Sequence, residues 1–301
     1  MDFNLLNNIV LFADRSALAI LIAVGISGMW LRSYPDALRQ VTVILNCAAV
    51  TCLAALAVTT IFVLFLRTAS LADVSLLETW PYLDKVINKS HFGTTWLGRC
   101  SALGIAILLY LACRARFAQI AHASILAAGL YIAFLISGAS HAGEDGLLTW
   151  ENINNSLHIA SACAWGGSVI LYAFIVRKLN NSHYAVGDTA QRLTSIATSA
   201  LVTVLVTGLI NAWLRLTTLD LLWTSDYGLV LLTKLLFVFF MMIIGATNRF
   251  ILIPALLKQE SHNQIGSPSH TYFRRGLYVD SGVFFIIIGF AVSLALLSPE
   301  H

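Results

Sequence analysis

Residues 137–167 read SGASHAGEDGLLTWENINNSLHIASACAWGG, and this stretch joins two hydrophobic segments through one acidic loop. One segment ends near His141, and the next opens at His158. Because segments joined by a short loop pack as antiparallel neighbours, we expect the two imidazoles at one face of a helical bundle. Neutral imidazole binds soft metals or haem iron through one ring nitrogen while an acceptor holds the other. The alternative is that each histidine only anchors its helix at an interface.

The composition is that of a membrane protein. Of 301 residues, 58% are hydrophobic and 11% charged, whereas about a quarter of a soluble domain is charged. The apolar runs match the roughly 20 residues that cross a bilayer core, and barrel strands are about half as long. We predict an all-α, polytopic bundle that forms a single domain over residues 1–301. The net charge of +3 is too small and dispersed to indicate nucleic-acid binding.

The hydrophobic runs predict eight transmembrane helices. They cover about residues 7–31, 41–66, 96–113, 118–139, 157–176, 193–214, 227–248 and 277–297. The N-terminus lacks the basic region of a cleavable signal, so the first run is expected to stay as a helix.

The charges between the helices predict the orientation. The odd-numbered connections are basic, with Arg32, Arg39, Arg114, Arg116, Arg177, Lys178, Arg192, Arg249, Lys258, Arg274 and Arg275. The positive-inside rule places them in the cytoplasm. Both termini and the loop between His141 and His158 then lie outside, which is the periplasm if this is a bacterial inner-membrane protein.

Ionisable residues inside predicted spans are costly and need partners. Asp14, Arg15, Arg99 and Lys234 all fall in the outer half, as do Asn211 and the two histidines, which predicts one polar cluster. Asp14 could simply pair with Arg99 or Lys234. The excess of cations alternatively suits an anionic group, such as a haem propionate, a quinone head group or a lipid phosphate.

Other candidates for metal handling are weaker. Thioether sulfur is a soft ligand for Cu(I), so Met29, Met241 and Met242 could continue a metal path inward, although such methionines usually only pack. His91 opens the third span, and His122 lies near the inner end of the fourth. The loop carboxylates Glu144, Asp145 and Glu151 could attract a metal or its carrier. His262 and His270 lie in a connection expected to be a mobile cytoplasmic loop.

Several motifs resemble the copper resistance protein D family of bacterial inner membranes. They are Gly138-Ala139-Ser140-His141-Ala142, Asn155-Ser156-Leu157-His158, Ala164-Trp165-Gly166-Gly167, Thr207-Gly208, Tyr227-Gly228, Lys234, Asn248-Arg249, Pro254 and Ser298-Pro299. The resemblance is strongest from about residue 93 to residue 299. One departure is Asp280, where the family pattern leads us to expect glutamate.

The resemblance implies an inner-membrane copper transport or homeostasis protein that takes a copper ion from a periplasmic CopC-like carrier and moves it inward. His141 and His158 match the motif histidines and become the leading copper ligands. Trp165, Gly166 and Gly167 are expected to let a neighbouring helix pack closely below the site.

Two further function classes stay open. The family's helical core is similar to di-haem cytochromes, so His141 and His158 could instead hold one haem b for electron transfer. The chain could also be a scaffold that docks the copper carrier without transport. No nucleotide-binding, serine-hydrolase or HExxH motif occurs, so we do not expect an enzyme.

Overall fold

A computed structural model describes residues 3–181, 186–216, 218–262 and 268–297. This part of the chain is helical and contains no strand. Eight segments are long and apolar enough to cross a membrane, which confirms the predicted number. The corresponding helices are α1 (Phe3–Trp30), α2 (Pro35–Ala72), α4 (His91–Cys113), α5 (Ala118–Gly138), α6 (Trp150–Asn181), α7 (Gly187–Arg215), α9 (Asp226–Thr247) and α11 (Pro268–Leu296).

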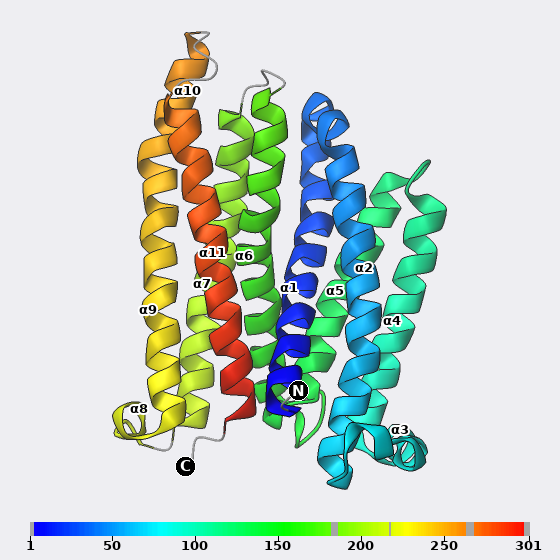
Figure 1. Cartoon of the computed structure of the whole chain (residues 1–301). Coiled ribbons are helices and arrows are strands. Elements are labelled where there is room, and N and C mark those ends of the chain that lie inside the picture. The colour runs from blue at the N-terminus through cyan, green and yellow to red at the C-terminus, as the bar shows by residue number, and fades with distance from the viewer. Residues whose placement is uncertain (1–2, 182–185, 217, 263–267, 298–301) are drawn as a thin grey trace.

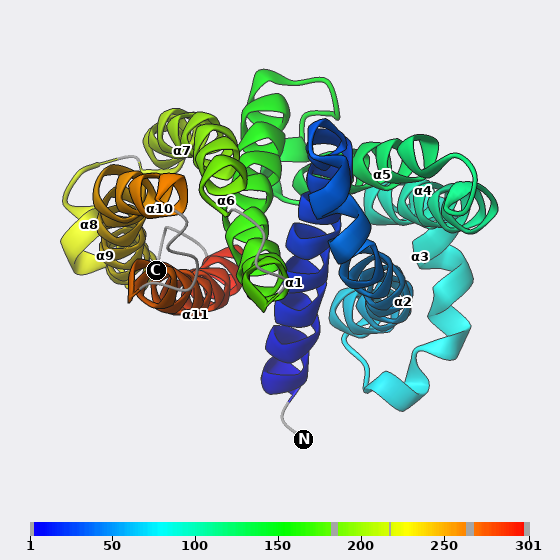
Figure 2. The same cartoon turned by 90° about the horizontal axis from the view of Figure 1, so that it is seen from above.

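The bundle is built around α1 and α6. Seen along its axis, α2, α4 and α5 lie on one side of α1, and α6, α7, α9 and α11 lie on the other (Figure 2). The beginning of α1 and the end of α11 lie at the same end of the bundle, together with α3 (Leu83–Lys89) and α8 (Leu221–Thr224) (Figure 1). We call this the terminal end. The basic connections lie at the opposite end.

The fifth span begins earlier than hydropathy predicts. Residues 150–156 were expected in the outer loop, but α6 starts at Trp150. The polar side chains of this first turn form hydrogen bonds with α5 and α7, so burial costs them little. Average hydropathy cannot detect polar residues that are satisfied by neighbouring helices.

The segment between the last two spans also differs from the prediction of a loop over residues 259–272. After the π-helix η5 (Asn248–Leu252), α10 (Ile253–Ser261) extends α9, and α11 already begins at Pro268. His270 is therefore a buried helical residue, 3% exposed, and its Nε2 lies 3.5 Å from Glu260 Oε1. His262 is exposed at the end of α10, as expected.

The connection between α2 and α4 exposes large apolar side chains at the terminal end. It contains the 3₁₀ helices η2 (Leu76–Glu78) and η3 (Trp80–Tyr82) before α3. Leu77 is 90% exposed and Trp80 is 70% exposed. Large apolar side chains at the end of a bundle are typical of a helix that lies along the membrane surface.

Glycines allow the central helices to approach closely. A Cβ on Gly167 of α6 lies 2.1 Å from the carbonyl oxygen of Ala19 on α1. A Cβ on Gly166 meets the ring of Phe284 on α11 at 2.1 Å. The Trp165-Gly166-Gly167 motif thus serves two contacts, since its two glycines face different neighbours. Small residues that let backbones approach are a common means of helix association in membranes.

Substitution of Gly167 by valine should weaken the contact between α1 and α6. The added side chain overlaps backbone that cannot rotate away, so we expect a loss of about 1–3 kcal/mol in stability. Thermal unfolding of the detergent-purified protein measures it. Gly104→Val is the matched control, because a Cβ on Gly104 meets nothing within 4 Å. Equal melting temperatures for the two variants would contradict this packing.

Candidate functional site

His141 lies on an exposed turn at the terminal end. It opens the 3₁₀ helix η4 (His141–Gly143) just after α5. Its ring Nδ1 donates a hydrogen bond to Glu144 Oε1 at 2.5 Å, and its side chain is 70% exposed. In the neutral ring, this hydrogen bond places the proton on Nδ1 and leaves the lone pair of Nε2 unused. Metal-ligating histidines commonly have their other ring nitrogen held by a carboxylate or carbonyl oxygen in this way.

His91 borders the same turn from the start of α4. Its Nε2 donates to the carbonyl oxygen of Gly138 at 2.9 Å, which leaves Nδ1 with a free lone pair. Gly143 packs directly on Gly138, so the turn folds back on the end of α5. The backbone of one tight turn therefore carries His141 and holds His91. We call His91, His141 and Glu144 the outer histidine site.

His158 lies deeper, on the side of α6 that faces α7. It follows Trp150 by eight residues, roughly 12 Å along the helix. Its Nδ1 lies 3.2 Å from the carbonyl oxygen of Val204 and 3.2 Å from Thr207 Oγ1. A proton on Nδ1 satisfies the carbonyl and leaves Nε2 free. Within the described part of the chain, no hydrogen bond or ion pair joins His158 to His141, so the two histidines occupy different surroundings.

An asparagine network lies about one turn before His158. Asn154 Nδ2 donates to the Thr207 carbonyl at 3.1 Å and to Asn211 Oδ1 at 2.8 Å. Asn211 Nδ2 donates to Asn155 Oδ1 at 3.1 Å, and Asn155 Nδ2 donates to Ser137 Oγ at 2.9 Å. The network joins α5, α6 and α7 and fixes their rotation at the level just outside His158.

A second polar group forms on the other side of α1. Asp14 is fully buried and accepts hydrogen bonds from Thr59 Oγ1 at 2.6 Å, from Arg15 at 3.1 Å and from both terminal nitrogens of Arg99. These contacts tie α1 to α2 and α4. Of the two partners considered for Asp14, Arg99 is the one that pairs with it, and we call this set the Asp14 cluster.

The single polar cluster predicted from sequence is two clusters. Asn211 belongs to the network near His158, while Asp14, Arg15 and Arg99 belong to the Asp14 cluster. Lys234 of α9 has no ion pair with Asp14. The spans carry their polar residues at similar depth, but the Asp14 cluster joins α1 to α2 and α4, whereas the asparagine network joins α5, α6 and α7. Depth alone does not determine which residues meet.

The remaining candidates lie in different surroundings. Glu144, Asp145 and Glu151 are exposed at the terminal end. Met241 is buried, and Met242 packs against the core. Met29 is 41% exposed on the outside of the bundle, so it does not extend a path through the interior.

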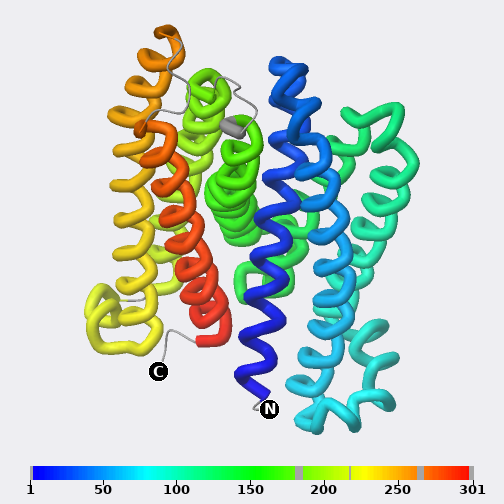
Figure 3. Tube along the Cα trace, turned by 45° about the horizontal axis from the view of Figure 1, so that its top comes forward, coloured from blue at the N-terminus to red at the C-terminus, as the bar shows by residue number. Residues whose placement is uncertain are grey.

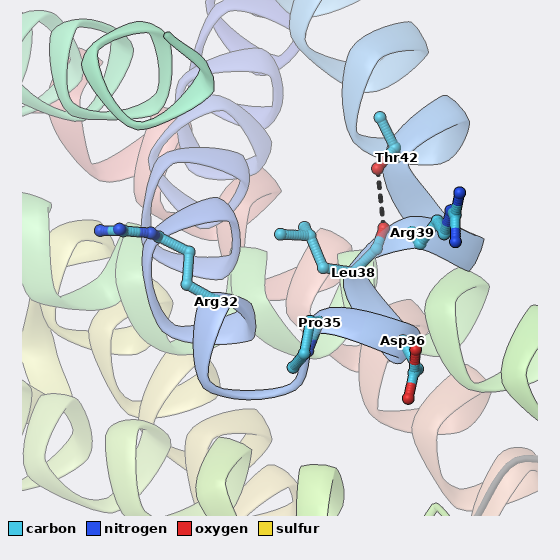
Figure 4. Close-up of a pocket in the computed structure, with 6 residues that line it drawn as sticks. All are labelled: Arg32, Pro35, Asp36, Leu38, Arg39 and Thr42. Carbon is cyan, nitrogen blue, oxygen red and sulfur yellow. Dashed lines mark hydrogen bonds between the residues drawn. The ribbon is translucent and has the colours of Figure 1, made fainter. Parts of the chain in front are cut away.

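Two observations on the described residues restrict where else a metal ion or a charged ligand could bind. No group of three or more His, Cys, Asp or Glu side chains is arranged to hold a metal ion. A surface hollow at the turn between α1 and α2 is lined by Arg32, Asp36 and Arg39 among others, but its two arginines point in opposite directions (Figure 4). This hollow therefore does not concentrate charge on one ligand.

Comparison with known proteins places the chain in a family. The family model "Copper resistance protein D" matches residues 187–294, and the model "Copper resistance protein D-like, N-terminal domain" matches residues 8–150. The chain belongs to the copper resistance protein D family. The match includes the N-terminal helices, which the motifs from residue 93 onward do not cover.

Curated relatives agree with this assignment. Copper resistance protein D of Pseudomonas syringae pv. tomato is 23% identical over 230 residues, 74% of each chain. Inner membrane protein YebZ of Escherichia coli K12 is 24% identical over 184 residues, 60% of this chain and 61% of the relative. No solved structure matches the chain. The family and the eight spans make this a multi-pass inner-membrane protein.

The sequence motifs did not identify several polar residues near His158. Asn154, Ser137 and Thr207 carry no charge and were not predicted as site residues, although Thr207, which contacts His158, belongs to a family motif. The available signal was the run Asn152-Ile153-Asn154-Asn155, about one turn before His158. Because this run was assigned to a loop, its residues were not expected to contact neighbouring helices.

We expect substitutions of Asp14 and Arg99 to have coupled effects on stability. Asp14→Leu leaves Arg99 buried without its counter-charge, which should cost about 3–5 kcal/mol, whereas Arg15, 26% exposed, can turn toward the surface. The double variant Asp14→Leu, Arg99→Met removes both charges and should recover much of the loss. Thermal unfolding of the single and double variants measures the coupling. Additive losses would mean that the two side chains act independently.

Proposed function

We propose that the protein receives a copper ion at the outer histidine site and passes it inward through His158. The observation that carries this proposal is that His91, His141 and His158 each have one ring nitrogen held by a carbonyl or carboxylate oxygen. The other nitrogen of each ring has a free lone pair. Imidazole suits copper, and an ordered ring loses little freedom when it binds.

The order of transfer follows from exposure. His141 and His91 lie at the surface of the terminal end, while His158 is half-buried about two turns inside α6. Copper that arrives from outside meets the outer site first. Two separate sites with few ligands bind more weakly than one closed site, which suits a cargo that must leave again.

We propose that the copper donor is a periplasmic CopC-like carrier. Glu144, Asp145 and Glu151 are exposed beside the outer histidine site and offer a negative surface to a carrier with basic groups. The orientation rests on the basic connections at the opposite end of the bundle, which favour a cytoplasmic location for that end. In this account the chain transports copper and does not catalyse a reaction.

Metal analysis and a visible spectrum of the detergent-purified protein test this function. We expect bound copper that decreases in His141→Ala and decreases further in the His141→Ala, His158→Ala variant, with no Soret band. His262→Ala is the matched control, because His262 is exposed at the opposite end and should not change the copper content.

Two results would overturn the proposal. A Soret band that disappears in the double variant would identify a haem b protein that serves copper handling by electron transfer. Carrier binding that survives the loss of both histidines, with no copper on the membrane protein, would indicate a docking scaffold.

A further inference from the structure

A groove runs between α1 and α11 on the outside of the bundle, near the terminal end. Asn8 and Phe12 line it from α1, and Ile286, Gly289, Phe290 and Ser293 line it from α11. The two helices run side by side in Figure 3. The groove has a volume of about 450 Å³ and is open along one side.

The polarity of the groove changes along its length. Asn8 and Ser293 lie closest to the terminal end, and the apolar side chains lie deeper in the membrane. Asn8 has no hydrogen-bond partner among the described residues, so its carboxamide is free to donate. The hydroxyl of Ser293 donates to the carbonyl of Gly289 at 3.2 Å and keeps its lone pairs. The polar end of the groove, its mouth, thus offers the Asn8 amide as an unused hydrogen-bond donor, and the deeper part of the groove is apolar.

The walls are held in place by aromatic pairs. The ring of Phe12 lies 6.1 Å from that of Phe285, and the ring of Phe290 stacks on that of Phe237 of α9 at 5.6 Å, centroid to centroid. Gly289 leaves the floor open, because a Cβ there meets no atom within 4 Å. The groove is therefore formed by side chains that already have partners, and its shape does not depend on an occupant.

We propose that an acyl chain of a phospholipid occupies this groove and that the Asn8 amide donates a hydrogen bond to the ester carbonyl of that lipid. Asn8 is partly buried at the mouth and has no acceptor among the described residues, so the ester carbonyl of a lipid in the groove can take its hydrogen bond. The mouth lies near the end of α1 and α11, where the ester groups of a bilayer lie, and the apolar floor lies below it.

Such a lipid stabilises the contact between the N-terminal and C-terminal parts of the chain. Asn8 and Phe12 fall in the N-terminal family model, residues 8–150, and Ile286–Ser293 fall in the C-terminal one, residues 187–294. A bound chain fills the space between α1 and α11 and adds contacts across this boundary. The site does not depend on the proposed copper transport, because none of its residues belongs to the histidine sites.

Photolabelling of the full chain tests the lipid site. The probe is phosphatidylethanolamine with a diazirine on one acyl chain, reconstituted with the protein in nanodiscs, and the labelled peptides are mapped by mass spectrometry. We expect label concentrated on Ile286–Ser293 and lost in Gly289→Leu, because Gly289 lines the groove and its Cβ position is open. Gly104→Leu is the matched control, since Gly104 is an open position on α4, away from the groove. Equal labelling of all lipid-facing helices, or unchanged labelling in Gly289→Leu, would overturn the proposal.

A second measurement keeps the proposal testable if Gly289→Leu fails to fold. Ether-linked phospholipids lack the ester carbonyl, so they should compete less well than ester-linked lipids for the groove. Asn8→Leu should abolish this preference and leave the labelling itself in place. An absence of preference in the parent protein would show that Asn8 does not contact the lipid ester.

Discussion

The membrane interior offers no water to polar groups, and this constraint determines how the helices meet. Asp14 is fully buried and is satisfied only by Thr59, Arg15 and Arg99, which fixes α1 against α2 and α4. The asparagine network near His158 does the same for α5, α6 and α7. A shift of one helix by a single turn breaks several of these bonds at once, so the two polar groups specify one arrangement among many that bury similar apolar area.

Close packing at the centre joins these two groups. Gly167 of α6 lies against the backbone of Ala19, so α1 and α6 approach more closely than larger side chains allow. The orientation of the site histidines depends on this packing of the helices. His158 is oriented by α7, and α7 is positioned by Asn211 and Asn154. His91 and His141 are oriented by the turn that ends α5. Ring orientation therefore follows from helix packing.

The sequence predicted the number of spans, a common end for the start of the first span and the end of the last one, and a pairing of buried Asp14 with one of two cations, of which Arg99 is the partner. These features depend on composition, on an even number of spans and on the cost of buried charge. It did not predict that α6 begins at Trp150, that His270 is buried or that the polar residues form two groups. Each of these depends on which helix lies next to which, and hydropathy measures only depth and polarity. The roles of His141 and His158 in copper binding remain predictions that rest on ring geometry and family membership.

The central claim is that copper passes from the outer histidine site to His158 and then inward. The most direct test is copper accumulation in sealed, right-side-out membrane vesicles, with the copper inside measured after the external metal is removed by a chelator. The account predicts accumulation above that of vesicles without the protein, and its loss in His158→Ala while surface copper binding persists. Accumulation by His158→Ala equal to that of the parent, or none by the parent itself, would contradict the account.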